Sequence, residues 1–214
     1  MTGMRVVAPP SATPKQAARL AVGWALARGY RPEGLHAYTN ADAGIEFWRI
    51  RAKHPGTLHK VIRPMRLEPH GYVLSEPAYP AGKPLYRLHR LYAQSDEPVV
   101  VVEGEKCADA MAHLGLLATT SGGADSASAA DWSPLAGREV RVWPDNDSPG
   151  QRYGVAVART LQRLGCKVCL IDVNALALPH GGDVVEWLER HPRAVAADVL
   201  QLACTHCTNG RGPA

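Results

Sequence analysis

The chain has 214 residues, which is enough for one or two domains. Hydrophobic residues make up 46% of it and charged residues 21%, so it can bury a core and is not disordered throughout. No apolar run approaches the ~20 residues of a membrane-spanning helix, and the start lacks the apolar stretch of a signal peptide. With five cysteines and no secretion signal, we expect a cytoplasmic protein without a disulfide framework.

Charge is divided unevenly along the chain. Residues 1–95 hold 14 Lys and Arg against 5 Asp and Glu, a net charge of +9, whereas residues 96–214 hold 10 against 15, a net charge of −5. A basic surface binds polyanions because binding releases their counterions, and clustered carboxylates attract divalent cations. The two halves therefore predict two different roles, although solvated surface charge explains the basic half equally well.

The first half predicts one helix followed by short strands. Thr13 suits the cap of a helix and Pro14 its first turn, so KQAARLAVGWALARGY predicts an amphipathic helix that stops near Gly29. The stretches AYTN, GIEFWRIRA, KVIRPM and KPLYRLHRLY then predict strands separated by loops that contain Pro and Gly. We therefore assign residues 1–35 to a lead-in and helix, and residues 36–95 to a small, basic, β-rich subdomain.

The second half alternates strands with helices. The run PVVVVE predicts a strand buried on both faces of a parallel sheet. Further strands are expected at 116–120, 138–143 and 167–173, and helices at 106–113, 150–164, 183–190 and 193–202. This alternation predicts right-handed crossovers and a compact, Rossmann-like α/β fold, with helices on both faces of a parallel sheet. We assign residues 96–192 to this domain and 193–214 to a C-terminal helix and tail.

Three acidic residues follow two of these strands. Glu103 ends the first buried strand, and Asp145 and Asp147 come just after the third. Ligands of an open parallel sheet bind beyond the carboxyl ends of its strands, so the three side chains are expected at one edge. Clustered carboxylates repel one another unless a cation such as Mg²⁺ is bound. The alternative is that Glu103 caps the next helix and that Asp145 and Asp147 form a surface turn.

The segments VVVVEGEKCADAM, SGGADSA, RVWPDNDSPG and GGDVVEWL, in this order over roughly residues 97–190, resemble the Toprim domain. They are most similar to the primase-type Toprim domains of phages, plasmids and other mobile elements. The resemblance implies that Glu103, Asp145 and Asp147 are catalytic and hold Mg²⁺ or Mn²⁺ during phosphoryl transfer. An alternative role for Glu103 is that of a general acid or base. It also implies a metal-binding role for Asp183, although His180, Gly181 and Gly182 replace the lysine context of the family.

Other residues are candidates for contacts with nucleotides or nucleic acid. Lys106 begins a helix beside the acidic edge, and Ser121, Gly122 and Gly123 form a loop of small residues after the second strand. In the β-rich part, basic side chains interleave with Trp48, a mixture that suits single-stranded DNA. These basic residues are Arg49, Arg51, Lys60 and Arg63. A solvated helix lysine and a plain connecting loop are the alternatives at the first two places.

Four cysteines imitate the spacing of a zinc site, with Cys166 and Cys169 in one pair and Cys204 and Cys207 in the other. Positions three apart on a strand face opposite sides, so the first pair does not converge easily. We therefore expect thiols without a metal and no zinc.

The leading hypothesis is a Toprim-type DNA primase or primase-like protein, which makes short RNA primers on single-stranded DNA in phage or plasmid replication. Its partners would be single-stranded DNA, ribonucleotides and a separately encoded replicative helicase, with no membrane. The alternatives are a metal-dependent Toprim nuclease and a non-catalytic nucleic-acid-binding subunit of a replication helicase.

Overall fold

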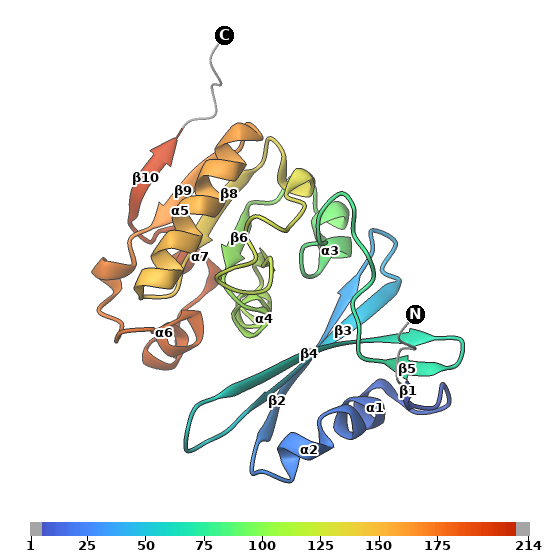
Figure 1. Cartoon of the computed structure of the whole chain (residues 1–214). Helices are drawn as coiled ribbons and strands as arrows, with labels where there is room; N and C mark the ends of the chain where they lie inside the picture. The colour runs from blue at the N-terminus through green and yellow to red at the C-terminus, as the bar shows by residue number, and fades with distance from the viewer. Residues whose placement is uncertain (1–5, 209–214) are drawn as a thin grey trace. The chain divides into compact units, whose positions relative to one another are not determined.

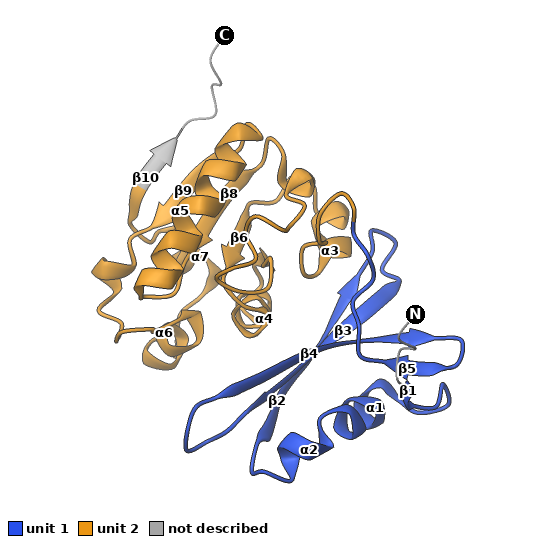
Figure 2. Cartoon of the chain, in the orientation of Figure 1, with its two compact units in different colours: residues 1–79 blue, residues 80–214 orange. Residues whose placement is uncertain are grey.

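The computed structural model describes residues 6–208 and divides the chain into two compact units, Met1–Tyr79 and Pro80–Ala214 (Figure 2). The sequence analysis places this boundary later, after residue 95. The segment 80–95 belongs to the second unit because its backbone is bonded there: the Lys83 amide donates to the Ala129 carbonyl at 2.7 Å, and the Tyr86 amide to the Thr120 carbonyl at 2.9 Å.

The first unit is a five-stranded antiparallel sheet with two short helices (Figure 1). The strands lie in the order β1-β5-β4-β3-β2. The elements are β1 (Val6–Ala8), α1 (Pro14–Ala21), α2 (Gly23–Leu26), β2 (Arg31–Thr39), β3 (Ile45–Lys53), β4 (Lys60–Glu68) and β5 (Gly71–Val73). The helix and the β-rich subdomain that the sequence analysis separates are therefore parts of one unit, which contains one sheet and two short helices.

The N-terminus of α1 forms as predicted. The Thr13 side chain accepts from the Gln16 amide at 3.3 Å, and the Gln16 side chain accepts from the Thr13 amide at 2.8 Å. Such a reciprocal pair satisfies two amides that the first helical turn leaves open. The expected single helix is interrupted at Val22, so that α2 follows as a separate turn.

The second unit alternates strands and helices as predicted. Its elements are α3 (Leu88–Ala93), β6 (Val99–Val102), α4 (Glu105–His113), β7 (Leu117–Thr119), η1 (Ser133–Leu135), β8 (Glu139–Trp143), α5 (Ser148–Arg163), β9 (Lys167–Ile171), η2 (Val173–Leu176), α6 (Val184–Arg190), α7 (Ala196–Leu200) and β10 (Cys204–Thr208). The sheet order is β10-β9-β8-β6-β7, and β9, β8, β6 and β7 run parallel. The chain is therefore a mixed α/β protein with two sheets.

Both faces of the second sheet are buried. Val99 and Val101 of β6 pack in one cluster with Val157 and Leu161 of α5, which crosses β8 and β9 in Figure 1. The alternate residues of the strand, Val100 and Val102, are equally buried but lie outside that cluster. The run of four valines thus supplies two cores, which is why the strand shows no alternation of polar residues.

Three expectations about individual segments are wrong. KPLYRLHRLY is not a strand: Leu88–Ala93 forms α3, whose Leu91 is buried in the core of the second unit. Residues 204–208, expected in a tail, add β10 as an antiparallel edge strand beside β9. Cys169 and Cys204 are bonded as a disulfide rather than free, because β10 lies next to β9. The rest of the predicted tail, 209–214, lies outside the described residues.

Candidate functional site

Glu103 stands at the carboxyl end of β6, as predicted. Its carboxylate oxygen Oε2 is buried, and its backbone carbonyl accepts a hydrogen bond from Thr120 Oγ1 at 2.8 Å. The cap of α4 is the next residue, Gly104, in extended conformation. Glu103 therefore does not cap the helix, and its side chain belongs to the edge where the parallel strands end.

Asp145 and Asp147 follow β8, which is the neighbour of β6; Val102 and Trp143 are partners in the register of the two strands. Asp147 caps α5, because its Oδ1 accepts from the Gly150 amide at 2.7 Å. A Cβ at Gly150 would lie 2.4 Å from the Asp145 carbonyl oxygen, so the tight turn requires glycine. The two carboxylates thus sit in a fixed turn, and one of them also holds a helix end.

Asn146, between the two aspartates, fastens a distant loop to this turn. Its amide donates to the Gly182 carbonyl at 2.9 Å, and its carbonyl accepts from the Gly181 amide at 2.8 Å. Its side chain donates to the carbonyls of Leu178 at 2.8 Å and Pro179 at 3.1 Å. Four hydrogen bonds from one residue therefore tie the segment before Asp183 to the end of β8.

Asp183 is the cap of α6. Its Oδ1 accepts from the Val185 amide at 2.7 Å and from the Glu186 amide at 3.2 Å, and Glu186 Oε2 accepts from the Asp183 amide. Burial raises the pKa of the Cys107 thiol well above its usual value, and the charges of Asp183 and Asp145 raise it further. Both aspartates thus act on one thiol in the first turns of α4, so they share a local environment.

A chain of hydroxyl groups supports the end of β6. Ser126 Oγ donates to Ser121 Oγ at 2.8 Å, Ser121 Oγ bonds Tyr153 Oη at 3.0 Å, and Tyr153 donates to the Val102 carbonyl at 3.2 Å. Burial raises the pKa of Tyr153 to about 12, so the phenol keeps its proton. Tyr153 therefore fixes the carbonyl that immediately precedes Glu103, a role that the sequence analysis missed because a helical tyrosine looks like an ordinary core residue.

Polar groups in the loop of Ser121, Gly122 and Gly123 form hydrogen bonds within the protein. The Ser121 hydroxyl is buried in that chain, and the Gly122 amide donates to Thr120 Oγ1 at 3.0 Å. Lys106, in contrast, is exposed on the first turn of α4. Beside the loop, a cavity of about 230 Å³ is lined by Asp125, Ser128 and Arg152 among others. Arg152 is an exposed cation that the sequence analysis also missed.

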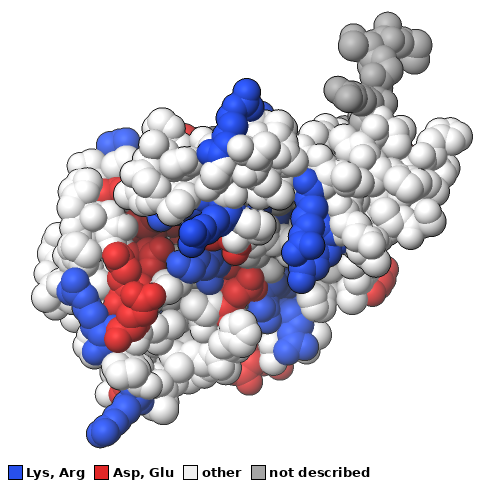
Figure 3. All heavy atoms as spheres, turned by 90° about the horizontal axis from the view of Figure 1, so that it is seen from below, with Lys and Arg blue, Asp and Glu red and all other residues white. Residues whose placement is uncertain are grey.

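The donor set of the acidic edge fits a hard divalent cation, because Glu103, Asp145, Asp147 and Asp183 supply only carboxylate oxygens. Within residues 6–208, however, no three His, Cys, Asp or Glu side chains are grouped closely enough to hold an ion by themselves. Mg²⁺ is commonly held by one or two carboxylates, with waters and substrate phosphates completing its shell. The edge fits that mode and not an all-protein cage. Figure 3 shows Asp and Glu atoms gathered on part of the face seen there.

The predicted basic residues of the first unit fall into two groups. Arg49 is buried, pairs with Glu76 at 3.3 Å and lies 5.0 Å over the Tyr38 ring, and Arg51 pairs with Glu33 at 2.5 Å. Trp48 is also in the core. Lys60 and Arg63 are exposed. The interleaved cations and Trp48 therefore do not form one open surface, because the strand alternation turns part of them inward.

A different basic row lies at one end of this sheet, where Arg31 and Lys60 are exposed and Lys53 is half-buried. Arg31, Lys53 and Lys60 are partners in register on the adjacent strands β2, β3 and β4. Cations directly opposite one another destabilise a sheet, so folding gives no reason for this row.

Aromatic rings lie at the same end of the sheet. Trp24 has 46% of its surface exposed, and its ring centroid lies 6.4 Å from that of Tyr30. The Arg28 guanidinium carbon lies 5.3 Å from the centroid of the Trp24 ring. Tyr30 in turn contacts His54 edge to face.

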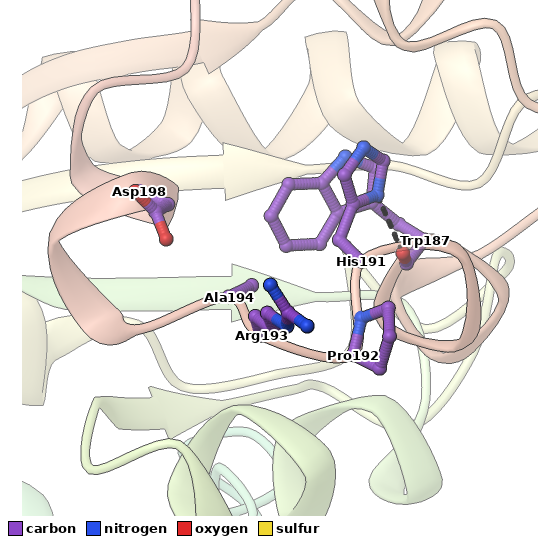
Figure 4. Close-up of a pocket in the computed structure, with 6 residues that line it drawn as sticks. All are labelled: Trp187, His191, Pro192, Arg193, Ala194 and Asp198. Carbon is purple, nitrogen blue, oxygen red and sulfur yellow. Dashed lines mark hydrogen bonds between the residues drawn. The ribbon is translucent and has the colours of Figure 1, made fainter.

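A further pocket, of about 480 Å³, lies on α6, α7 and the turn between them (Figure 4). It is lined by Trp187, His191, Pro192, Arg193, Ala194 and Asp198. His191 stacks on Trp187 with ring centroids 4.4 Å apart, and its Nδ1 lies 2.8 Å from the Trp187 carbonyl oxygen. None of the four predicted acids lines this pocket, so it is separate from the acidic edge.

No helix among the described residues is long and apolar enough to cross a membrane. No protein-family model matches the sequence, and no curated protein matches it. Among solved structures, the chain is similar to the primase of Aquifex aeolicus, in a structure of its zinc-binding and RNA polymerase domains. The TM-score is 0.49 and the identity 12%, and the match covers 91% of this chain and 49% of that one. The chain thus spans about half the length of this neighbour, and a likeness at this level decides neither fold nor function.

Proposed function

We propose that the protein is a Toprim-type, metal-dependent nucleotidyl transferase that makes short RNA primers on single-stranded DNA. The observation that supports the proposal is the placement of the acids along the chain: Glu103 and Asp145 follow neighbouring parallel strands, and Asn146 bonds the loop before Asp183 to the end of β8. The motifs that resemble primase-type Toprim domains supply the reaction class.

The four carboxylates have unequal roles in this proposal. Asp147 and Asp183 each use Oδ1 to cap a helix, so they are held rigidly and at the same time stabilise the fold. Glu103 and Asp145 cap no helix. Glu103, Asp145, Asp147 and Asp183 would hold Mg²⁺ or Mn²⁺ together with phosphate oxygens. The bound cation neutralises charge that develops on the transferring phosphoryl group.

The chain's own cations and hydroxyls complete the site. Lys106 would contact a nucleotide phosphate, a role supported by its exposure on the first turn of α4, which begins at Glu105, two residues after Glu103. Tyr153 holds the end of β6 and so positions Glu103 without touching the substrate.

The first unit would contact the template through this basic row. Arg31, Lys53 and Lys60 suit the phosphates of a single strand, and Trp24 offers a ring face for a base. These residues replace Arg49 and Arg51, which are bonded to acids of the same unit.

The test is a priming assay with single-stranded DNA, four ribonucleotides and Mg²⁺ or Mn²⁺, in which new oligomers and template breakdown are both measured. Asp145→Asn is the informative variant because this residue caps no helix. Glu139→Gln is the matched control, since Glu139 is exposed at the opposite end of the same strand. Oligomers that disappear in Asp145→Asn and persist in Glu139→Gln are expected. Template breakdown without oligomers would replace the primase with a nuclease, and binding without either product would leave an accessory subunit.

A further inference from the structure

The disulfide between Cys169 and Cys204 closes a ring around one of the candidate site residues. It joins β9 to the edge strand β10 across 35 residues of sequence, with the two Cα atoms 5.7 Å apart. The enclosed segment contains η2, α6 and α7, and therefore Asp183. A covalent bond at the sheet edge thus fixes both ends of the segment that brings this carboxylate to the site.

The enclosed segment is built of short elements. Helix α6 has seven residues and α7 five, and the buried residues of these helices are Val184, Trp187 and Val199. Ile171, Val173 and Leu178 are buried as well, the hydrogen bonds of Asn146 hold the loop before Asp183, and β10 pairs with β9. Short helices have little stability of their own, so their order depends on this packing and on the constraint at the ends of the segment.

The chemical setting of the disulfide favours exchange with thiols. Arg141 is the register partner of Cys169 on β8, and its Nη1 lies 3.3 Å from Cys169 Sγ and 3.6 Å from Cys204 Sγ. Both cysteines are only partly buried. A neighbouring guanidinium stabilises the thiolate, which is both the attacking and the leaving form in thiol–disulfide exchange.

We propose that Cys169 and Cys204 form a reversible redox site that controls the order of residues 170–203 and, through them, the position of Asp183. In oxidation, the Cys169 thiolate attacks a small-molecule disulfide such as oxidised glutathione and releases one thiol. The Cys204 thiolate then attacks Cys169 Sγ and releases the second thiol. The protein loses two electrons and two protons, and the small disulfide becomes two thiols. Only the catalytic consequence rests on the proposed function; the redox site itself does not.

The test is amide hydrogen exchange of the full chain equilibrated with reduced or oxidised glutathione, with the disulfide mapped by mass spectrometry. In the oxidised protein we expect a Cys169–Cys204 peptide pair and roughly tenfold slower exchange in α6 than in the reduced protein. Helix α5, which lies outside the ring, serves as the internal reference and stays unchanged. Equal exchange of α6 in the two states would overturn the proposal.

Three variants separate this disulfide from other effects of oxidation. Cys169→Ser and Cys204→Ser should each give the exchange of the reduced protein under both conditions. Cys207→Ser should keep the full redox response, although Cys207 occupies the register position opposite Cys169. If Cys207→Ser alone lost the redox response, the functional disulfide would involve Cys207 and not Cys204, and the proposal would be overturned. Because exchange needs no primer synthesis, a redox-responsive chain that makes no primers would refute the proposed function and leave the redox site standing.

Discussion

The acidic edge of the second unit and the basic sheet of the first unit use charge in opposite ways. At the acidic edge, the predicted carboxylates lie where the parallel strands end, and local hydrogen bonds fix the loops that carry them. In the basic sheet, two of the four predicted cations, Arg49 and Arg51, form ion pairs with acids of the same unit. A separate row that includes Arg31 and Lys53 lies in register at one end of the sheet. Charge that follows a strand thus stays at the edge of the sheet, whereas charge along a strand is partly turned inward and paired.

The largest effect is expected where a cation of the basic sheet is structural. Arg49→Ala removes a buried partner of Glu76 and leaves that carboxylate with only part of its surface in water, so it should destabilise the protein by roughly 3 kcal/mol. Urea unfolding measures the change, with Lys60→Ala as the control. An Arg49→Ala protein as stable as Lys60→Ala would show that Arg49 is not structural.

A change of comparable size in the free energy of unfolding is expected at high pH, and it comes from Tyr153 beside the acidic edge. Burial raises the pKa of Tyr153 to about 12 from its usual 10, so folding favours the neutral phenol. The resulting stabilisation is complete below pH 10 and is lost as the pH rises through 12, with a span of about 3 kcal/mol. Tyr153→Phe removes the ionisation, so the difference in unfolding free energy between wild type and variant should shrink over this interval. A constant difference from pH 9 to 12 would contradict this origin.

A smaller effect on stability is expected to distinguish the two carboxylates that cap helices, Asp147 and Asp183, from Asp145. Asp147→Ala and Asp183→Ala each remove the cap of a helix and should cost about 1 kcal/mol of stability. Asp145→Asn should leave the thermal midpoint within about 1 °C of wild type. If Asp145→Asn lowers the midpoint as much as the two caps do, its carboxylate has a structural role and the division of tasks at this edge is wrong.

The smallest effect on stability should come with the clearest effect on binding. Lys53→Ala and Lys60→Ala each relieve repulsion within the row, so stability should rise by about 0.3 kcal/mol or stay unchanged. Each should weaken the binding of single-stranded DNA and reduce the slope of log affinity against log salt by about 1. Fluorescence titration at several salt concentrations measures both, and an unchanged slope would remove the row from the template path.

The sequence predicts local features of both units better than it predicts the pairing of distant segments. The valines of β6, the cap at Thr13 and the acids after β6 and β8 depend on local patterns, and these elements form where expected. The pairing of β3 with β2 and β4 depends on register between distant segments, which no local pattern contains. The ion pair of Arg49 with Glu76 and the edge strand β10 were missed for the same reason.

The role of Asn146 illustrates what a motif leaves out. Its position between two aspartates is visible in the sequence, yet its four hydrogen bonds to the 178–182 loop follow only from the fold. Tyr153 is similar, because its hydroxyl reaches the end of β6 from the helix that covers the sheet. The candidate site residues could thus be named from sequence, whereas the residues that position them could not.

The most direct test of the central claim is Mn²⁺ binding to the full chain, followed by electron paramagnetic resonance with and without a ribonucleoside triphosphate. If the carboxylates beyond β6 and β8 form one metal site completed by phosphate, the wild type and Glu139→Gln bind Mn²⁺ more tightly when the triphosphate is present. Asp145→Asn should then lose at least about tenfold in affinity, because it removes a charged ligand. Equal Mn²⁺ binding by Asp145→Asn and Glu139→Gln would contradict the account.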